Sequence, residues 1–215
     1  RQVRADHGAG AIGLLASPHS TVEELALAGA LVRGLGSENI DTRLRAADFG
    51  NAAAPGQARW LGRPIAELSS LQRVLVVGSN LRKDHPLFAQ RIRQAVRKGA
   101  QVNAVNSRVH DWAMPVANTL VAESGVWVQA LAQVAASIAR EKGVASPWNV
   151  ATSVESDAIA RSLLGGERKA VLLGNAAAHH EQAGNLLALA RFIAEHTGAT
   201  VGYLTEAANT VGAQL

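Results

Sequence analysis

One stretch, residues 73–107, constrains the fold most strongly, because it has the pattern of a strand–helix–strand unit. It opens with the apolar run Val74–Val77, which stops at Gly78-Ser79-Asn80. A short β-branched run that ends in turn-forming residues is typical of a buried parallel strand. An amphipathic helical pattern follows, and a second β run at 102–105 completes the unit. In such a unit the loop after the first strand, here 78–85, lies at the carboxyl edge of the sheet, where ligands usually bind.

The helix of this unit combines an apolar face with a basic one. Pro86 stands where a first-turn proline is tolerated, and Gly99 stands where a helix end prefers glycine. Phe88, Ile92 and Val96 form the expected buried face, and the outward face carries Arg91, Arg93, Arg97 and Lys98. The net charge of +4 is otherwise scattered along the chain, and no aromatic residues are interleaved with these cations. This argues against a nucleic-acid interface, and we expect a solvated face or a contact with an acidic partner subunit.

Composition sets the size of the core and excludes several classes of site. With 215 residues, 48% hydrophobic and 18% charged, the chain can bury one large α/β domain or two small ones. The uncharged run 124–139 is too short and too polar for a membrane span, so we expect no direct membrane insertion. The chain has no cysteine, which excludes disulfides, thiolate zinc sites and ordinary iron–sulfur ligation within these residues.

A second strand–helix–strand pattern follows a boundary-like segment at 143–153. Helices are predicted at 155–164 and 181–196, and strands at 170–173 and 200–204. The loop Gly174-Asn175 repeats the glycine-ended turn at Gly78-Ser79-Asn80. The sequence therefore predicts an α/β fold with two Rossmann-like parallel-sheet lobes, residues 1–145 and a truncated 146–215. Their glycine-ended loops are expected to face a shared cleft.

Two motifs near the amino terminus have structural explanations. Residues 8–13 match G-x-G-x-x-G, but a dinucleotide fingerprint needs a strand before it, and polar residues precede these glycines. We interpret them as a loop that leads into a strand at 12–16. The run Ser20–Glu24 holds two overlapping capping boxes, so its carboxylates are predicted to cap a helix that ends before Gly36.

The remaining polar candidates do not form a recognisable catalytic or metal site. His179 and His180 are adjacent, so on a helix they point about 100° apart and rarely share a metal. Helix-start hydrogen bonding or a vestigial ligand contact is predicted instead. Asp84, just before His85, is interpreted as a helix N-cap. No nucleophile elbow surrounds Ser79. We predict no catalytic residue and no metal ligand.

Taken together, several segments resemble a known family. Similarity to the molybdopterin oxidoreductase superfamily is carried by Ser17–Glu24, Gly36–Asp41 and Val77–Asn80. Within it, similarity to the large iron–sulfur subunits of bacterial respiratory NADH:quinone oxidoreductase, complex I, is carried by His85–Arg91, Leu173–His179 and Asn209–Ala213. The resemblance covers most of the chain. It implies lobes of the type of domains II–III in formate dehydrogenase and DMSO reductase, within a longer protein whose iron–sulfur clusters lie outside these residues.

The chain departs from the pattern of the active family members. Acidic side chains in their D-P-R and P-G-T-D motifs help to hold guanine; the corresponding positions here are Asn106-Ser107-Arg108 and Glu123–Val126. Leu81 replaces the proline that usually follows Gly-x-Asn. Losing an acidic group that paired with a guanine edge should cost several kcal/mol of binding, because the base would be left unpaired. The resemblance therefore implies a fragment without cofactor, in which a vestigial pocket comprises Gly78, Ser79, Asn80, Gly174, Asn175 and His179.

Three functional hypotheses follow. The leading one is a cofactor-free structural module of the large complex I subunit, in contact with other subunits of the peripheral arm at the cytoplasmic side of the bacterial inner membrane. The alternative is a fragment of an active molybdopterin guanine dinucleotide enzyme similar to formate dehydrogenase. A free-standing nicotinamide-binding protein is the third, and the misplaced glycine motif at residues 8–13 disfavours it.

Overall fold

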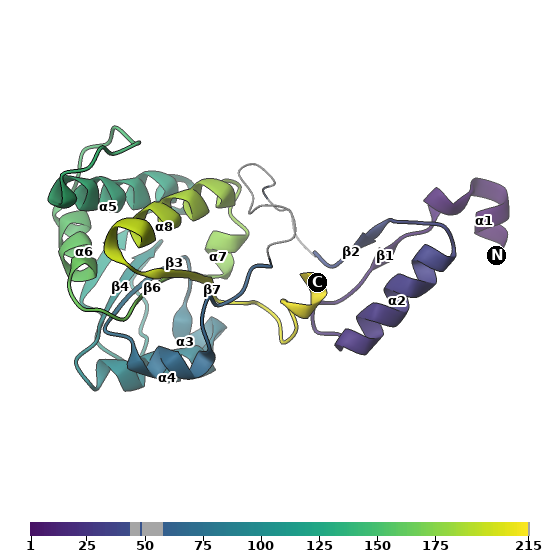
Figure 1. The fold of residues 1–215 in the computed structure, drawn as a ribbon, viewed down its shortest axis with the longest axis horizontal. Helices are drawn as coiled ribbons and strands as arrows, with labels where there is room; N and C mark the ends of the chain where they lie inside the picture. The colour runs from purple at the N-terminus through teal and green to yellow at the C-terminus, as the bar shows by residue number, and fades with distance from the viewer. Residues whose placement is uncertain (44–47, 49–57, 215) are drawn as a thin grey trace. The chain divides into compact units, whose positions relative to one another are not determined.

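The computed structural model describes residues 1–43, 48 and 58–214 (Figure 1). The chain divides into two compact units. The described residues of the first unit are 1–43, 58–59 and 205–214, and those of the second are 48 and 60–204. In the described part of the chain, no helix has both the length and the apolar character needed to cross a membrane.

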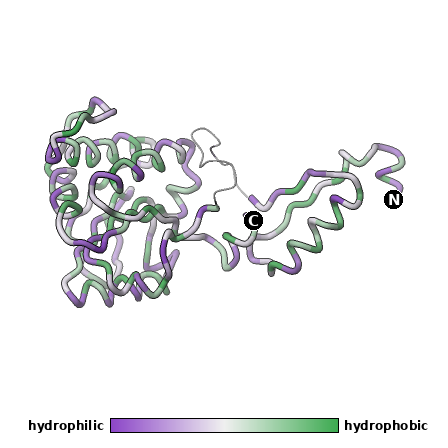
Figure 2. Tube along the Cα trace, in the orientation of Figure 1, coloured by the Kyte–Doolittle hydropathy of each residue, from purple (hydrophilic) through white to green (hydrophobic). Residues whose placement is uncertain are grey.

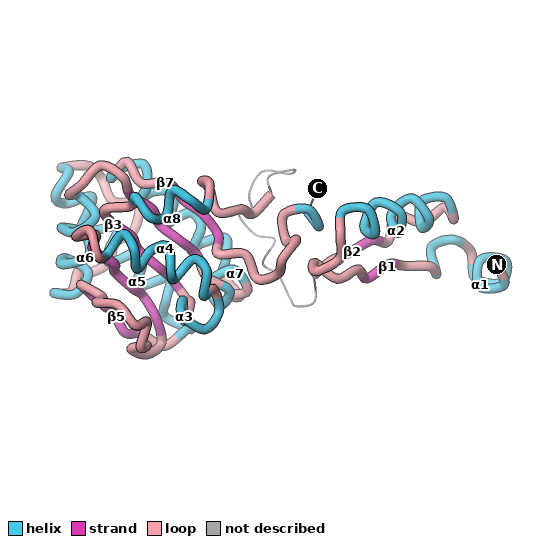
Figure 3. Tube along the Cα trace, turned by 90° about the horizontal axis from the view of Figure 1, so that it is seen from below, coloured by secondary structure: helices cyan, strands magenta, loops and turns pink. Residues whose placement is uncertain are grey.

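The second unit is built on a five-stranded parallel sheet. Its strands are β3 (Arg73–Val77), β4 (Gln101–Asn106), β5 (Asn118–Val121), β6 (Lys169–Leu173) and β7 (Thr200–Tyr203). They lie side by side in the order β5-β4-β3-β6-β7, and every neighbouring pair is parallel (Figure 3). The parallel α/β class predicted from the sequence is therefore confirmed.

Helices cover both faces of this sheet (Figure 1). One face carries α5 (Trp127–Lys142), α6 (Val154–Leu164) and α8 (Ala183–Thr197), and the other carries α4 (Pro86–Val96) and the 3-10 helix η2 (Ile65–Ser70). Short helices follow the strand ends: α3 (Leu81–Asp84), η3 (Ser124–Val126) and α7 (Asn175–Ala178). Hydrophilic and hydrophobic residues alternate around the longer helices, as expected for elements that each bury one side (Figure 2).

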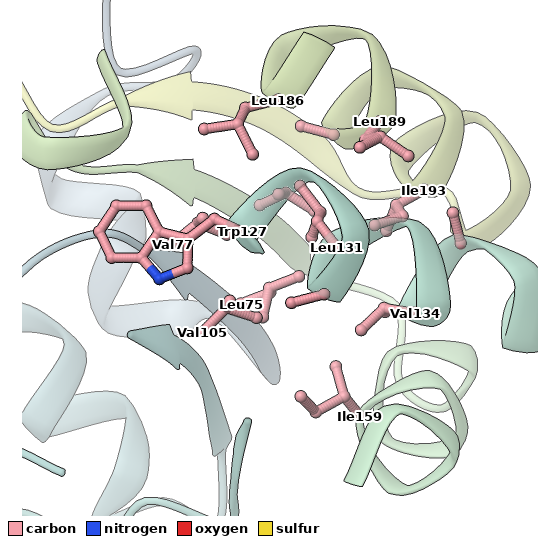
Figure 4. Close-up of a cluster of buried hydrophobic side chains, with 14 of the residues drawn as sticks. Leu75, Val77, Val105, Trp127, Leu131, Val134, Ile159, Leu186, Leu189 and Ile193 are labelled. Carbon is pink, nitrogen blue, oxygen red and sulfur yellow. The ribbon is translucent and has the colours of Figure 1, made fainter. Parts of the chain in front are cut away.

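The larger core lies between the sheet and α5, α6 and α8 (Figure 4). Trp127, Leu131, Val134 and Ile138 fall at i, i+4, i+7 and i+11 along α5, the spacing that predicts a buried helical stripe, and each is at most 3% exposed. It packs against side chains from β3 and β4 below and from α8 above. A helix that buries one such stripe on a sheet and another helix gains most of its stability from packing rather than from intrinsic propensity.

The first unit is small and has a two-stranded parallel sheet. Its elements are α1 (Gln2–His7), η1 (Ala9–Ala11), β1 (Leu14–Leu15), α2 (Val22–Gly34), β2 (Ile40–Asp41) and η4 (Gly212–Gln214). The capping box that forms is Thr21 with Glu24, in which the Glu24 amide donates to the Thr21 hydroxyl and the Thr21 amide to the Glu24 carboxylate. Residues 8–13 precede β1, as predicted, and do not follow a strand.

The predicted division into lobes at 145/146 is wrong. Strand β6 pairs with β3 in the register Val74↔Ala170, so both strand–helix–strand units share one sheet. The end of the chain belongs to the other unit, where the Asn209 amide donates to the Pro18 carbonyl at 3.1 Å. Local patterns identify strands but not their partners, because parallel pairing joins segments that are far apart in sequence.

Candidate functional site

The carboxyl edge of the sheet has one topological switch point. From β3 the chain proceeds to β4 and β5 on one side, whereas β6 and β7 extend the sheet on the other side of β3. In open α/β sheets, ligands bind at the point where the strand order reverses in this way. The loops that meet there follow β3 and β6, at Gly78-Ser79-Asn80 and Gly174-Asn175. The structure thus brings together the two loops that the sequence singled out.

These two loops pack directly against each other. The Ala176 amide donates to the Gly78 carbonyl at 3.1 Å. A Cβ atom on Gly174 would overlap the Ser79 Cβ and lie 2.5 Å from the Gly78 carbonyl oxygen. A Cβ on Gly78, whose φ is +65°, would lie 2.7 Å from the Ala177 nitrogen. Both glycines are therefore required for close backbone approach, and the contact occupies the switch point itself.

Asn106, the last residue of β4, holds the first loop in place. Its Oδ1 accepts from the Ser79 amide at 3.0 Å, and its Nδ2 donates to the Ser79 carbonyl at 3.1 Å. The side chain is buried, with 3% exposure. An amide side chain can accept and donate at once in this way, whereas an ionised carboxylate can only accept. Comparison with the family motif marked Asn106 as a departure, but its role in the loop is visible only in the structure.

Ser79, Asp84 and His85 lie close together without forming a catalytic triad. The Asp84 carboxylate accepts from the Asn80 amide at 2.8 Å and from the Ser79 hydroxyl at 3.3 Å. His85 Nδ1 lies 3.4 Å from the same hydroxyl. In a triad the carboxylate contacts the histidine and the serine is accessible, whereas here both groups converge on a serine that is 3% exposed. Asp84 was predicted to cap the following helix; it instead binds the amide that precedes α3, because the chain turns back over four residues.

Two amide oxygens at the switch point have no hydrogen-bond partner within the described residues. They are Oδ1 of Asn80 and Oδ1 of Asn175, one from each loop, and both atoms are buried. Buried acceptors are normally paired, so each of these oxygens is suited to accept from a donor group of a bound molecule or water. They are the features of this edge that most favour a ligand.

The two histidines after α7 have separate environments. His180 Nδ1 accepts from the Gln182 amide at 3.0 Å, so Nε2 carries the proton and donates to the Ser124 carbonyl at 2.8 Å. This confirms the predicted helix-start hydrogen bonding, because Gln182 immediately precedes α8. His179, a predicted pocket residue, is half-buried at the end of α7. Among the described residues, no group of three or more His, Cys, Asp or Glu side chains could hold a metal ion.

A recess of about 530 Å³ lies beside the edge strand β5 and not between the two glycine loops. Its lining residues are Thr119, Leu120, Val121, Ala122, Val126, Gln129, Ala130, Gln133, Ser153 and Glu155. None of these side chains is a cation, and the ionisable one is a carboxylate. Such a lining does not suit the pyrophosphate of a dinucleotide, which is normally held by cations and free backbone amides.

The donor set at the switch point does not fit a guanine dinucleotide. The Asn106 side chain has both hydrogen-bonding groups engaged with Ser79, and the Asp84 carboxylate is engaged with the loop backbone. The glycines that allow a backbone to approach a pyrophosphate in such sites here allow the two loops to approach each other. Among the buried side-chain oxygens that the structure describes at this edge, those of Asn80 and Asn175 are the ones without a hydrogen-bond partner.

Comparison with known proteins identifies similar chains. The family model described as molybdopterin oxidoreductase matches residues 1–214. A nitrate reductase from Klebsiella oxytoca is 32% identical over 111 residues, which are 49% of this chain and 13% of that protein. A chain in the crystal structure of the formyltransferase/hydrolase complex FhcABCD from Methylorubrum extorquens, in complex with methylofuran, has a TM-score of 0.63 and 19% identity. That alignment covers 89% of this chain and 52% of the other, and the likeness shows a shared fold.

Proposed function

Because this chain belongs to the molybdopterin oxidoreductase family, we propose that it is a cofactor-free module of that fold. It serves as a structural part of the large iron–sulfur subunit of a respiratory NADH:quinone oxidoreductase. Its partners are other subunits of the peripheral arm, at the cytoplasmic side of the bacterial inner membrane. The module supports electron transfer from NADH to quinone without carrying a redox centre of its own.

The observation that carries the proposal is the closed contact between the loops at Gly78 and Gly174. A ligand at this switch point would have to separate two backbones joined by the hydrogen bond from Ala176 to Gly78. Moving the first loop would also break the two hydrogen bonds between Asn106 and Ser79, which the ligand would have to replace or leave unmade. Each buried polar group left unpaired costs about 1–3 kcal/mol, so opening the site would offset much of the binding energy.

The composition supports the same proposal. The 215 residues include no cysteine, so no thiolate in this chain can ligate an iron–sulfur cluster or a molybdenum ion. The segments that resemble the large complex I subunit include Leu173–His179, which contains the second of the two loops in contact. A member of this fold that has filled its own switch point remains useful as a rigid scaffold, because its parallel sheet is buried on both faces.

Metal and pterin analysis of the full-length native subunit tests the proposal. We expect molybdenum and tungsten well below one atom per chain by elemental analysis, and no pterin fluorescence after oxidation of the denatured protein. The subunit should co-purify with NADH dehydrogenase activity. One metal and one pterin per chain would refute the proposal.

The second candidate function is a fragment of an active molybdopterin guanine dinucleotide enzyme. The specific observation in its favour is the pair of unpartnered acceptors, Asn80 Oδ1 and Asn175 Oδ1, because the Watson–Crick edge of guanine carries N–H donors. The same elemental analysis separates the two candidates. Replacing Asn80 or Asn175 by Ala would lower pterin content only if this second function is correct.

A further inference from the structure

The outward face of α4 differs from every other long helix of the described chain. Helices α2, α5, α6 and α8 each contain at least one carboxylate, whereas α4 contains none. Its outward face, with the residues that end it, carries Arg91, Arg93, Arg97 and Lys98, and all four are exposed. We call these four residues the α4 basic face. None of them forms an ion pair with any residue that the structure describes.

The burial of the inner side of α4 leaves this face free for a partner. Ala89, Ile92 and Ala95 are at most 7% exposed and pack toward the sheet and η2. On the outer side, Arg93 and Arg97 are one turn apart, and Arg91 and Lys98 are two turns apart on the other flank. Figure 1 shows α4 on the side of the sheet opposite α5 and α8.

Requirements internal to the helix explain only part of this pattern. Cations in the last turn interact favourably with the helix dipole, which accounts for the residues from Arg93 onward. Arg91 lies outside that turn, and the like charges of Arg93 and Arg97, four residues apart, repel each other. Mixed charges would serve a solvated face better. The accumulated positive charge is therefore suited to an opposite charge from outside this unit.

The geometry points to an acidic protein surface as the partner, and we infer that the α4 basic face docks a carboxylate-rich surface of a neighbouring subunit. Three of its four cations are arginines, the charged residue that is enriched in protein interfaces. Leu87, which is 78% exposed, and Gln90 precede the cations on the outward side of α4, so the face has an uncharged and partly apolar patch at its amino end. Protein interfaces commonly combine an apolar patch with charged residues beside it.

Nucleic acid and membrane surfaces fit the α4 basic face less well. Single-stranded nucleic acid is usually bound through exposed aromatic side chains, but Phe88 is turned inward and stacks on His85 with centroids 5.8 Å apart. A membrane-surface helix needs a broad apolar face turned outward, and the apolar face of α4 is buried against the sheet. The inference rests on the proposed function, because that function places the chain in a complex beside other subunits.

Charge reversal in the full-length subunit, expressed with an affinity tag in its native host, tests the inference. The test variants are R91E/K98E and R93E/R97E, and the matched control K142E/R161E makes the same charge change on the opposite face of the sheet. The readouts are NADH:ferricyanide reductase activity and partner subunits recovered with the tag, at salt concentrations from about 0.05 to about 0.5 M. We expect recovery to fall about tenfold or more with each α4 variant and to stay unchanged with the control. Recovery with the wild-type protein should decrease as salt increases.

The outcomes separate the inference from the proposed function. Each variant is first compared with the wild-type protein by thermal denaturation, and exposed positions are expected to leave the midpoint unchanged. A milder variant, R91Q/K98Q, covers the case in which a reversal prevents folding. If wild-type protein recovers partners and the α4 variants recover as much, the inference is overturned and the proposed function stands. If wild-type protein recovers no NADH dehydrogenase, both fail. Loss of binding to single-stranded RNA or anionic vesicles in the α4 variants, with normal assembly, would also overturn the inference.

Discussion

The contact between the two glycine loops predicts a large cost for Gly174→Ala. Gly174 has φ −85°, which any residue can adopt, so the substitution tests space and not backbone conformation. The added Cβ would overlap the Ser79 Cβ and lie 2.5 Å from the Gly78 oxygen, so the loops must separate. Overpacking of this kind costs about 1–3 kcal/mol, and weakening the hydrogen bond from Ala176 to Gly78 adds about 0.5–1.5 kcal/mol.

The expected loss of unfolding free energy is therefore about 2–4 kcal/mol, measured by urea denaturation. The thermal midpoint should fall by about 5–15 °C, at roughly 2–4 °C per kcal/mol for a chain of this size. Gly125→Ala is the matched control, because nothing lies within 4 Å of its added Cβ. Its stability should stay within about 0.5 kcal/mol of wild type. Equal stabilities for the two variants would refute the loop contact and, with it, the main support for a cofactor-free module.

Two further predictions concern the polar groups that hold the second unit together. Asn106→Asp should lower the unfolding free energy by about 1–3 kcal/mol at neutral pH, because a carboxylate cannot donate to the Ser79 carbonyl. Burial should raise the pKa of that new carboxyl, so stability should recover as the pH falls in urea titrations, and a pH-independent loss would contradict this reasoning. The Ser137 hydroxyl donates to the Asp157 carboxylate and, together with Arg140, holds the pKa of Asp157 below its usual value. The ionised Asp157 therefore stabilises the fold at neutral pH, and this stabilisation is lost as the pH falls through the lowered pKa. Asp157→Asn should lower the unfolding free energy by less than about 1 kcal/mol near neutral pH and leave it unchanged at strongly acidic pH, in the same urea titrations. An equal loss at both pH values would show that the ionised carboxylate is not the source of the stabilisation.

Local patterns were enough to identify most elements of the second unit. The run Val74–Val77 became β3, and Pro86 became the first residue of α4. The stripe from Trp127 to Ile138 became the buried side of α5. These features depend on residues within a few turns of each other, so periodicity and capping preferences determine them. The resemblance to the molybdopterin oxidoreductase superfamily likewise depended on short motifs that can be read along the chain.

The candidate site was only half predictable. The sequence selected Gly78-Ser79-Asn80 and Gly174-Asn175, because glycine-ended loops after buried strands mark the carboxyl edge of a parallel sheet. It did not reveal that Gly174 lies against Ser79, nor that the Asn106 side chain binds both the amide and the carbonyl of Ser79. The sequence likewise assigns Asp84 to the start of the following helix, whereas its carboxylate binds the Asn80 amide four residues earlier.

The sequence by itself determined most strands and helices of the second unit, the faces they bury and the loops that end in glycine. The tertiary structure alone decided that β3 pairs with β6, which merges two expected lobes into one sheet and brings the two loops into contact. The physical reason is that every strand of a doubly covered parallel sheet has a similar apolar run. Such runs specify burial but not a partner, and the pairing is settled only when the whole sheet and its two helical layers pack together.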